Sequence, residues 1–468
     1  MTDTRGRRSE RDGHIAKVIP LRLSTLSADE PASDLSGLVQ RAGTTFTELV
    51  AIAEDYGLDV PERVQLAAVL LDVRLTAAAA TPPRGPQSAL SRGTFEAQGG
   101  LQWADDLDSA VGALIELWRC NLDRREFLGA MGALAVVSDV ALRWLVAPPD
   151  EGVERNLGTR RVGLTDVDEI RVMRRNLKAI DDARGGGAAL PIAVKYLRRE
   201  VAPLLRGRFT DPIGRALFSA TAEFTLGVGW MAYDAGRHGL AQRYMTQALR
   251  MSHAANDRAF GGRVLAAMSH QALHLGDVRH GIDLASAART GTEGAVTPTV
   301  SAMLAAMEAC AHASHGDAKR CLKALSDAER ALGQSNPAED PGWVDFDEGG
   351  LAGHFARSFR DLNRPGEAER FATRSIDICH PRHLRTRMQR HAILATAHVQ
   401  LGDLEGACAV GRRVLEEARG LSSTRTLDDV THLVRLVNAR GAGLPAREFT
   451  EQARALLKPG RRPPTTRS

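Results

Sequence analysis

Residues 227–249 read GVGWMAYDAGRHGLAQRYMTQAL and contain the unit that decides the fold, an apolar helical run, a glycine and a second apolar run. The glycine, Gly236, recurs as Gly276 and Gly316 at a constant interval of 40 residues (276 − 236 and 316 − 276). Because glycine adopts a left-handed backbone conformation at no steric cost, each position is expected to end one helix before the next begins. The stretch therefore predicts a repeat made of antiparallel helix pairs.

Further copies of this unit follow in the second half of the chain. The stretch 393–415, ILATAHVQLGDLEGACAVGRRVL, has the turn at Gly402, and the stretch 354–376, HFARSFRDLNRPGEAERFATRSI, has Asn363 in place of the glycine. A helix pair with one apolar stripe buries that stripe only when the neighbouring pairs stack on it. We therefore expect at least five helix pairs between Pro212 and a C-terminal cap pair.

The spacing of small residues around the turn indicates the type of repeat. Gly229, Ala241 and Ala248 lie at fixed offsets from Gly236, where two helices of a pair must cross closely. This spacing resembles the tetratricopeptide repeat, although the period of 40 exceeds the roughly 34 residues usual for it, which indicates longer connections. The predicted fold class is all-α, a right-handed superhelical solenoid of tetratricopeptide-like helix pairs with a small N-terminal helical module.

Composition agrees with a helical array and excludes several classes of protein. Only 4% of the 468 residues are aromatic, which suits helices packed through small residues better than a sheet. The net charge of +4 gives no global argument for nucleic-acid binding. Five cysteines without a CxxC pair predict a reducing compartment. With neither a signal peptide nor an apolar run of about 18 residues, the chain is expected to be cytoplasmic and not to cross a membrane.

Shifts in composition predict the domain organisation. The expected segments are a disordered N-terminus (1–33), a small helical module (34–75), an Ala/Pro/Gly/Ser-rich linker (76–100), a helical N-terminal part of the array (101–211), the repeat array with its C-terminal cap (212–457) and a disordered basic tail (458–468). The module at 34–75 is either a degenerate helix-turn-helix or an ordinary helical cap. We favour the cap because its third helix presents few side chains that read bases.

The stretch DRREFLGAMGALAVVSDVALRWLVAPP has the shape of a twin-arginine export signal. Such signals lie at the extreme N-terminus, whereas 123 residues precede Arg124 here. We therefore predict that Arg124 and Arg125 begin an internal helix. Phe127, Leu128 and Trp144 are expected to be buried against the first helices of the array.

Few motifs in the sequence carry chemistry. GxSxG and HExxH are both missing, which argues against an enzyme and leaves no cofactor to assign. The triplet at 185–187 is followed by neither Lys nor Ser/Thr, so a flexible turn is expected there instead of a phosphate-binding loop. His270 and His274 share a helix face, but no third ligand is evident, and no metal site is predicted.

The expected working surface is the concave side of the solenoid, which the first helix of each pair faces. Counting back from the turns places there the residues Trp230, Tyr233, Arg263, His270, His274, Arg357, Arg360 and Gln389. Aromatic and arginine side chains are those that recognition hot spots favour. An aromatic anchor beside arginines predicts binding of an extended peptide with acidic groups, although packing between repeats is an equal alternative for the two aromatic residues. Both arginines of the later copy are expected to face solvent.

Several motifs occur in an order that resembles the negative regulators of sporulation and antibiotic production of streptomycetes. They are RREFLGAM, ALRWLVAPP, GWMAYDAG, AQRYMTQAL, MSHQALHLG, AMLAAMEACA and SFRDL, between roughly Trp103 and Ala418. The resemblance implies a cytoplasmic tetratricopeptide-type regulator of development and secondary metabolism, often with an N-terminal helix-turn-helix. The stretch RAGTTFTELV is similar to part of that module, but the polar recognition segment that should follow has no counterpart.

Two functions therefore remain open. The first is a regulatory protein that binds a protein or peptide partner in its groove and affects transcription indirectly, with homo-oligomers possible. The second is a DNA-binding regulator whose array senses a ligand. Because the array is near neutral and the N-terminal module lacks reading side chains, we expect at most weak, salt-sensitive and sequence-indifferent DNA binding.

Overall fold

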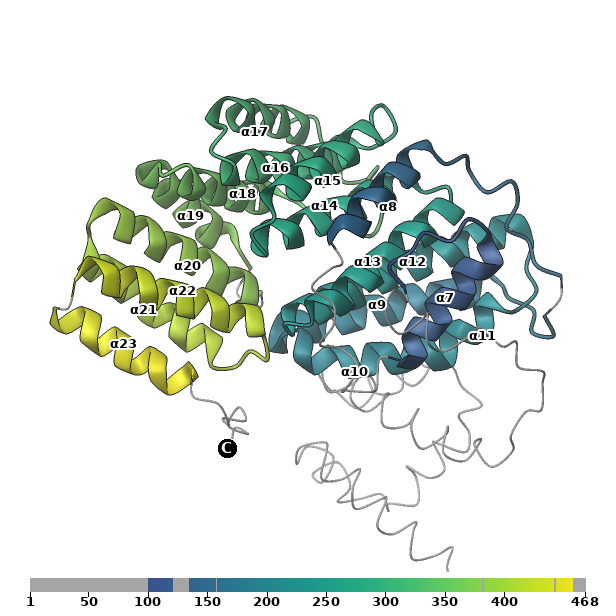
Figure 1. Cartoon of the computed structure of the whole chain (residues 1–468), viewed down its shortest axis with the longest axis horizontal. Helices are drawn as coiled ribbons and strands as arrows, with labels where there is room; N and C mark the ends of the chain where they lie inside the picture. Colours follow the sequence, from purple (N-terminus) through teal and green to yellow (C-terminus); the bar gives the residue numbers. More distant parts are fainter. Residues whose placement is uncertain (1–99, 121–133, 157, 381–382, 442, 458–468) are drawn as a thin grey trace, which may run out of the picture. The chain divides into compact units, whose positions relative to one another are not determined.

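The computed structural model describes residues 100–120, 134–156, 158–380, 383–441 and 443–457 (Figure 1). The predicted module at 34–75, the linker up to residue 99, the tail after residue 457, and Arg124, Arg125, Phe127 and Leu128 lie outside these ranges. The chain divides into two units, residues 1–90 with 168–180 and residues 91–167 with 181–468. Every contact described below lies within the second unit.

The described residues form helices, and no β-strand is found among them beyond two isolated bridges that join residues 155–161 to 208–209. The first helices are α7 (Leu107–Cys120), α8 (Leu134–Val146), α9 (Leu164–Arg184), α10 (Gly186–Tyr196), the short π-helix η2 (Leu197–Val201) and α11 (Ala202–Leu205). Within the same ranges, no helix is both long enough and apolar enough to cross a membrane.

Five helix pairs and a cap pair follow, as predicted. The pairs are α12 (Asp211–Asp234) with α13 (His238–Ala254), α14 (Arg258–His274) with α15 (Val278–Thr290), α16 (Pro298–Ser314) with α17 (Ala318–Leu332), α18 (Glu348–Asp361) with α19 (Pro365–Ile378), α20 (Leu384–Leu401) with α21 (Leu404–Ala418), and α22 (Thr424–Arg440) with α23 (Leu444–Leu457). Each helix packs on its sequence neighbours.

All five predicted turn residues have a left-handed backbone. The φ angles are +74° at Gly236, +83° at Gly276 and Gly316, +84° at Gly402 and +55° at Asn363. A further turn, which was not predicted from the sequence, lies at Asn256, where φ is +56°. Asn256 lies midway between Gly236 and Gly276, and it ends α13 before α14 begins. Asparagine tolerates this conformation better than other residues with a side chain, so turns occur between pairs as well as within them.

An aspartate after most of these turns begins the next helix. The side chains of Asp257, Asp277, Asp317 and Asp403 each accept a hydrogen bond from the backbone N–H three residues on. This N-cap satisfies one of the amide groups that a helix start leaves unpaired. The pair Asn-Asp at 256–257 repeats the Gly-Asp pattern of the other turns, which is the signal that could have located the missed turn.

Small residues lie where the helices cross closely. A Cβ atom added to Gly229 would lie 3.2 Å from the Met245 side chain on α13, and Ala241 and Ala248 are fully buried. Trp144 of α8 is also fully buried, as predicted, and lies against the array helices. A Cβ atom at Gly261 would lie 2.5 Å from its Nε1 atom. The small-residue positions therefore let α13 pack on α12, and Gly261 lets Trp144 pack on α14.

The first helices of the pairs form one continuous row. Contacts join α12 to α14, α14 to α16, α16 to α18, α18 to α20 and α20 to α22. The row also closes, because α22 contacts α12. We call α12, α14, α16, α18, α20 and α22 the inner helices. Their closure was not anticipated from the sequence, which predicted only that successive inner helices lie side by side.

The glycine triplet at 185–187 forms the predicted turn, between α9 and α10, and this turn packs closely on the segment before α22. The Gly187 N–H donates to the Ser422 carbonyl at 3.0 Å, and the Ser422 N–H donates to the Arg184 carbonyl at 2.7 Å. A Cβ atom at Gly186 would lie 2.5 Å from the Met231 carbonyl oxygen. Glycine is needed here because the backbone preceding α22 lies directly on the backbone that joins α9 to α10.

Candidate functional site

The predicted site residues come from four inner helices, with a fifth inner helix contributing two more. Trp230 and Tyr233 lie on α12, and Arg263, His270 and His274 on α14. Arg357 and Arg360 lie on α18, Gln389 on α20, and the additional residues Arg425 and Asp429 on α22. We call these side chains the inner-helix cluster.

An aromatic group of four rings joins α12 to α14. The ring centroid of Trp230 lies 5.6 Å from that of Tyr233 and 5.3 Å from that of His270. Tyr233 in turn lies 5.8 Å from His270 and 5.4 Å from His274, both edge-on. Edge-to-face packing at these distances is favourable because the ring edges are positive and the ring faces negative. The predicted neighbourhood of Trp230 and Tyr233 with the α14 histidines is therefore confirmed.

Two guanidinium groups lie over the aromatic faces. The Arg263 guanidinium carbon is 5.6 Å from the Trp230 ring centroid, and that of Arg425 is 5.1 Å from the Tyr233 ring centroid. Both distances are within the range of a cation–π interaction. Burial lowers the pKa of Arg263 to about 10, against the opposing charge of Asp345, so the group still carries its charge at neutral pH.

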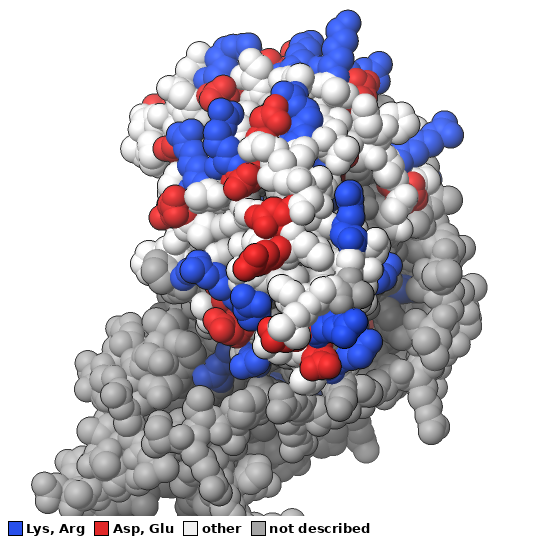
Figure 2. Space-filling view, turned by 90° about the vertical axis from the view of Figure 1, so that its left-hand side faces the viewer, with Lys and Arg blue, Asp and Glu red and all other residues white. Residues whose placement is uncertain are grey.

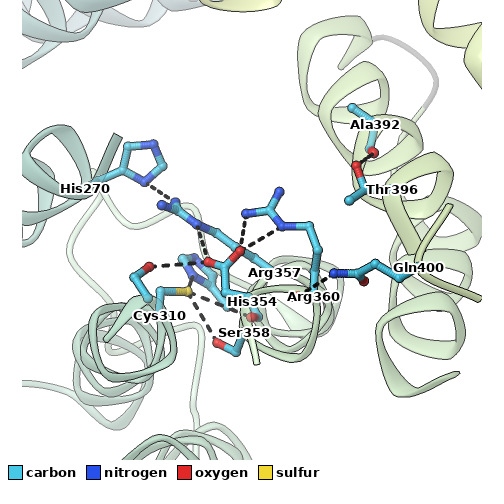
Figure 3. Close-up of polar contacts among 11 residues, drawn as sticks. His270, Cys310, His354, Arg357, Ser358, Arg360, Ala392, Thr396 and Gln400 are labelled. Atoms are coloured by element: carbon cyan, nitrogen blue, oxygen red, sulfur yellow. Dashed lines mark hydrogen bonds and ion pairs between the residues drawn. The ribbon is translucent and has the colours of Figure 1, made fainter. Parts of the chain in front are cut away.

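Arg357 is not solvent-facing, which corrects the prediction made from the sequence. Only 18% of its side chain is exposed, because it reaches across to α14, where its Nη1 group donates to His270 Nδ1 at 3.0 Å (Figure 3). It also lies near the Asp361 carboxylate, with 4.0 Å between Arg357 Nε and Asp361 Oδ2. The close-up shows Arg357 between His270 and the other polar side chains of α18. Arg357 therefore joins two inner helices.

Arg360 is also less exposed than expected, at 28% of its side chain. Its guanidinium holds Asp361 Oδ1 at 2.7 and 2.8 Å, and its backbone carbonyl accepts a hydrogen bond from Gln400 on α20 at 3.0 Å. Gln389, with its amide oxygen turned toward α22, accepts hydrogen bonds from Arg425 Nη2 at 2.6 Å and Nε at 3.0 Å. Both predicted residues therefore belong to the inner-helix cluster, each with a partner inside the chain.

Below Arg357 lies a small buried group on α16 and α18. The Cys310 thiol lies 3.4 Å from His354 Nδ1 and accepts a hydrogen bond from Ser358 at 3.6 Å (Figure 3). Burial and the charge of Arg357 lower the pKa of His354 to about 3, and burial raises the pKa of the Cys310 thiol. An imidazole of such low pKa is a weak base, and a thiol whose pKa is raised stays protonated at neutral pH. The thiolate form that acts as a nucleophile is therefore not favoured here.

Burial and neighbouring charges also set the pKa values in the inner-helix cluster. Burial, with the charge of Arg357 as the next contribution, lowers the pKa of His270 well below its usual value, so its Nδ1 atom is free to accept the Arg357 hydrogen bond. Burial raises the pKa of Asp429 to about 6 although Arg425, Arg360 and Arg357 oppose the shift. The cluster therefore combines four arginines with two histidines whose pKa values are lowered and a carboxyl group that titrates close to neutrality.

Two donors of the cluster have no partner. Trp230 Nε1 and the Tyr233 hydroxyl are buried and make no hydrogen bond with any described residue, and Tyr233 as a whole is 0% exposed. The Arg425 guanidinium lies over the Tyr233 ring without making a hydrogen bond of acceptable geometry with the hydroxyl. A buried polar group without a partner costs free energy, which a bound acceptor would recover.

Asp234 on α12 lies where the row of inner helices closes, between α12 and α22. Its carboxylate, 1% exposed, accepts hydrogen bonds from the Gly186 N–H and the Ser423 hydroxyl, both at 2.8 Å. Arg425 Nε lies 3.4 Å and Arg385 Nη1 3.5 Å from it. Arg385 also binds both oxygens of Asp181 at 2.8 Å. We call Asp181, Asp234, Arg385 and Arg425 the clasp, because they join α20 and α22 to the start of the array.

Neither the clasp, which includes Arg425, nor His354 or Asp429 was predicted from the sequence. The sequence predicts that the α22 residues belong to a C-terminal cap pair. In an array whose pairs follow one another without closing, such a cap lies far from the first pair. Only the contact of α22 with α12 brings them into the cluster. The sequence signal that could have indicated these residues is the four-residue spacing of Arg425 and Asp429. It places both on the helix face that also carries the buried Val430 and Leu433.

No group of three or more histidine, cysteine or carboxylate side chains is placed to hold a metal ion in the part of the chain that the structure describes. Comparison of the chain with protein-family models and with curated proteins finds no match. The candidate site is therefore defined by its own geometry.

Proposed function

We propose that this protein is a regulatory interaction module, a tetratricopeptide-type superhelix whose inner-helix cluster binds an extended peptide segment of a partner protein. Through that partner it affects transcription of genes for development and secondary metabolism, as the resemblance noted above implies. The partner segment carries acidic groups. No catalytic step is part of the proposal.

One observation carries the proposal, the convergence of recognition-type side chains from five separate inner helices. Two aromatic rings, four arginines and two unpartnered donors meet on one face although they are spread over some two hundred residues of sequence. Partly desolvated arginines bind carboxylates more strongly than exposed ones do, and aromatic residues supply rigid contact area. Because the row of inner helices is closed, an extended segment fits this face better than a folded domain.

The charge on the outer surface supports a protein partner over nucleic acid. On the face shown in Figure 2, lysine and arginine are interspersed with aspartate and glutamate in the described residues. A nucleic-acid surface would show a stripe of one sign. The alternative, direct DNA binding, depends on residues 34–75, which lie outside the described ranges.

The test is site-specific photo-cross-linking in the native host. A photoreactive amino acid replaces Gln389 inside the cluster or, as the control, Arg320 on α17, whose side chain is 71% exposed. We expect one partner peptide to cross-link at position 389 and not at position 320. The added substitution Arg360→Gln should weaken that cross-link about tenfold, as loss of a charge-assisted contact does, while Lys323→Gln on α17 should not.

Two results would contradict the proposal. Cross-links at position 320 alone would place the partner on the outer helices. A sequence-specific footprint of purified protein on DNA at physiological salt would favour the DNA-binding alternative.

A further inference from the structure

A pocket lies beside α17, α18 and α19, lined by residues other than those of the inner-helix cluster. Its volume is about 770 Å³, which is within the range of small-molecule sites. The connector 333–347 between α17 and α18 forms one wall. This connector lengthens the repeat, since the turns Gly316 and Asn363 are 47 residues apart (363 − 316) where the earlier ones are 40. The pocket therefore exists because the array departs here from its regular period.

The pocket has an aromatic floor. Phe355 and Phe371 meet with ring centroids 4.7 Å apart, and Phe346 of the connector lines the same space. Phe346 and Phe371 are only partly buried. The Arg370 guanidinium already lies 4.7 Å from the Phe371 ring centroid, which shows that this aromatic group accepts a cation on a face.

Carboxylates surround the floor. The lining includes five of them, against the single guanidinium of Arg374: Glu329, Asp340, Asp345, Asp347 and Glu348. Asp340 accepts a hydrogen bond from Thr297, Asp347 caps α18 and Glu348 pairs with Arg374. Arg263 and Arg390 also act on Asp345 and Asp347. Three guanidinium groups cannot neutralise five carboxylates, so the rim keeps a net negative charge. A negative rim over an apolar floor attracts cations and disfavours anions.

An independent observation also indicates a ligand. Thr299 lines the pocket and is 3% exposed, yet its hydroxyl makes no hydrogen bond with any described residue. A buried hydroxyl without a partner is a group that a bound donor or acceptor would satisfy. It lies at the start of α16, where Thr297 donates a hydrogen bond to Asp340 of the connector.

We infer that this pocket binds an organic cation, an ammonium or guanidinium group on an apolar stem. The stem packs on Phe346, Phe355 and Phe371, and the charged group reaches the carboxylate rim. Aromatic faces with nearby carboxylates are the combination that recognises such groups. The ligand is either a free amine or a lysine or arginine side chain of a peptide. This inference is independent of the proposed function of the inner-helix cluster.

The test is calorimetric titration of the full chain with agmatine, which carries a guanidinium and an ammonium on a four-carbon stem. A second arm uses an acetylated Ala-Arg-Arg-Ala amide, and glutarate is the anionic control. We expect agmatine or the peptide to bind at millimolar or lower concentration, more weakly as salt is raised, and glutarate not to bind. Tighter binding of agmatine identifies a free amine as the ligand, and tighter binding of the peptide identifies a peptide side chain.

Matched variants locate the binding. Glu329→Gln with Asp345→Asn, both exposed, should weaken binding at least about fivefold, and Phe346→Leu should weaken it by removing an aromatic face. Glu339→Gln, on the same connector but outside the pocket lining, should leave it unchanged. The inference is overturned if neither cation titrates, or if the pocket variants bind as the Glu339→Gln control does while far-ultraviolet circular dichroism shows each variant folded.

Discussion

Closure of the row of inner helices depends on one buried carboxylate, and Asp234→Asn tests this directly. The substitution keeps the volume and one carbonyl oxygen but removes the charge. It also turns an NH₂ group toward either the Gly186 N–H or the Ser423 hydroxyl, which now donate to Asp234 at 2.8 Å. Arg425 loses its only carboxylate within 4 Å among the described residues, whereas Arg385 keeps its two bonds to Asp181.

The magnitude follows from these contacts. Removing one partner of a buried ion pair costs about 3–5 kcal/mol, and a hydrogen bond to a charged group contributes about 1.5–3 kcal/mol. Two features reduce the loss, because Arg385 stays paired and the negative charge of Asp234 itself contributes to raising the pKa of Asp181. We therefore expect Asp234→Asn to lower the free energy of unfolding by about 2–4 kcal/mol.

The assay combines thermal unfolding with hydrogen exchange. The melting temperature should fall by several degrees, and the amides of α22 should exchange faster while those of α16 do not, since α16 packs mainly on α14, α15, α17 and α18. Asp327→Asn is the control, because that carboxylate pairs with Arg330 at 3.1 Å and is 23% exposed. Its loss should cost less than about 1 kcal/mol. If Asp234→Asn melts like this control and α22 exchange is unchanged, the clasp does not hold the row closed.

Two further predictions concern acid and the turns. The pKa of His354 is about 3 in the folded state against 6.5 in an unfolded chain, so between these values the unfolded state binds one more proton. The free energy of unfolding should therefore fall as the pH drops from about 6.5 toward 3. Urea titrations across this range should show a shallower fall for His354→Asn, and an equal fall in both proteins would contradict the low pKa of His354. Asp429, with its pKa raised from 3.8 to about 6, contributes the opposite sign between those values. Gly276→Ala should lower the free energy of unfolding by about 1–2 kcal/mol through its φ of +83° alone, since no atom lies within 4 Å of the added methyl group. Gly227→Ala is equally unhindered but lies inside α12, and it should raise the free energy of unfolding by about 0.5–1 kcal/mol. Equal melting temperatures of these two variants would refute the argument from backbone conformation.

The helix pairs could be predicted from the sequence because their causes are local. A glycine or asparagine that takes a left-handed backbone, an aspartate that caps the next helix and small residues at a fixed offset all act within some twenty residues. The same periodicity placed the predicted side chains on the inner helices, so their neighbourhood on α12 and α14 could be inferred. For this reason the turns at Gly236 and Asn363 were predictable.

Which ends of the array meet, and how far each side chain is buried, depend on how the helix pairs pack in three dimensions. Closure depends on the small rotation between successive pairs, which accumulates over the whole array and is not written in any one repeat. It brings Arg425 and Asp429 of α22 to Tyr233 of α12, and it buries Arg357, which a linear count leaves in solvent. Likewise, the connector 333–347 reads as a plain loop in the sequence, and it becomes a pocket wall only because α17, α18 and α19 pack around it.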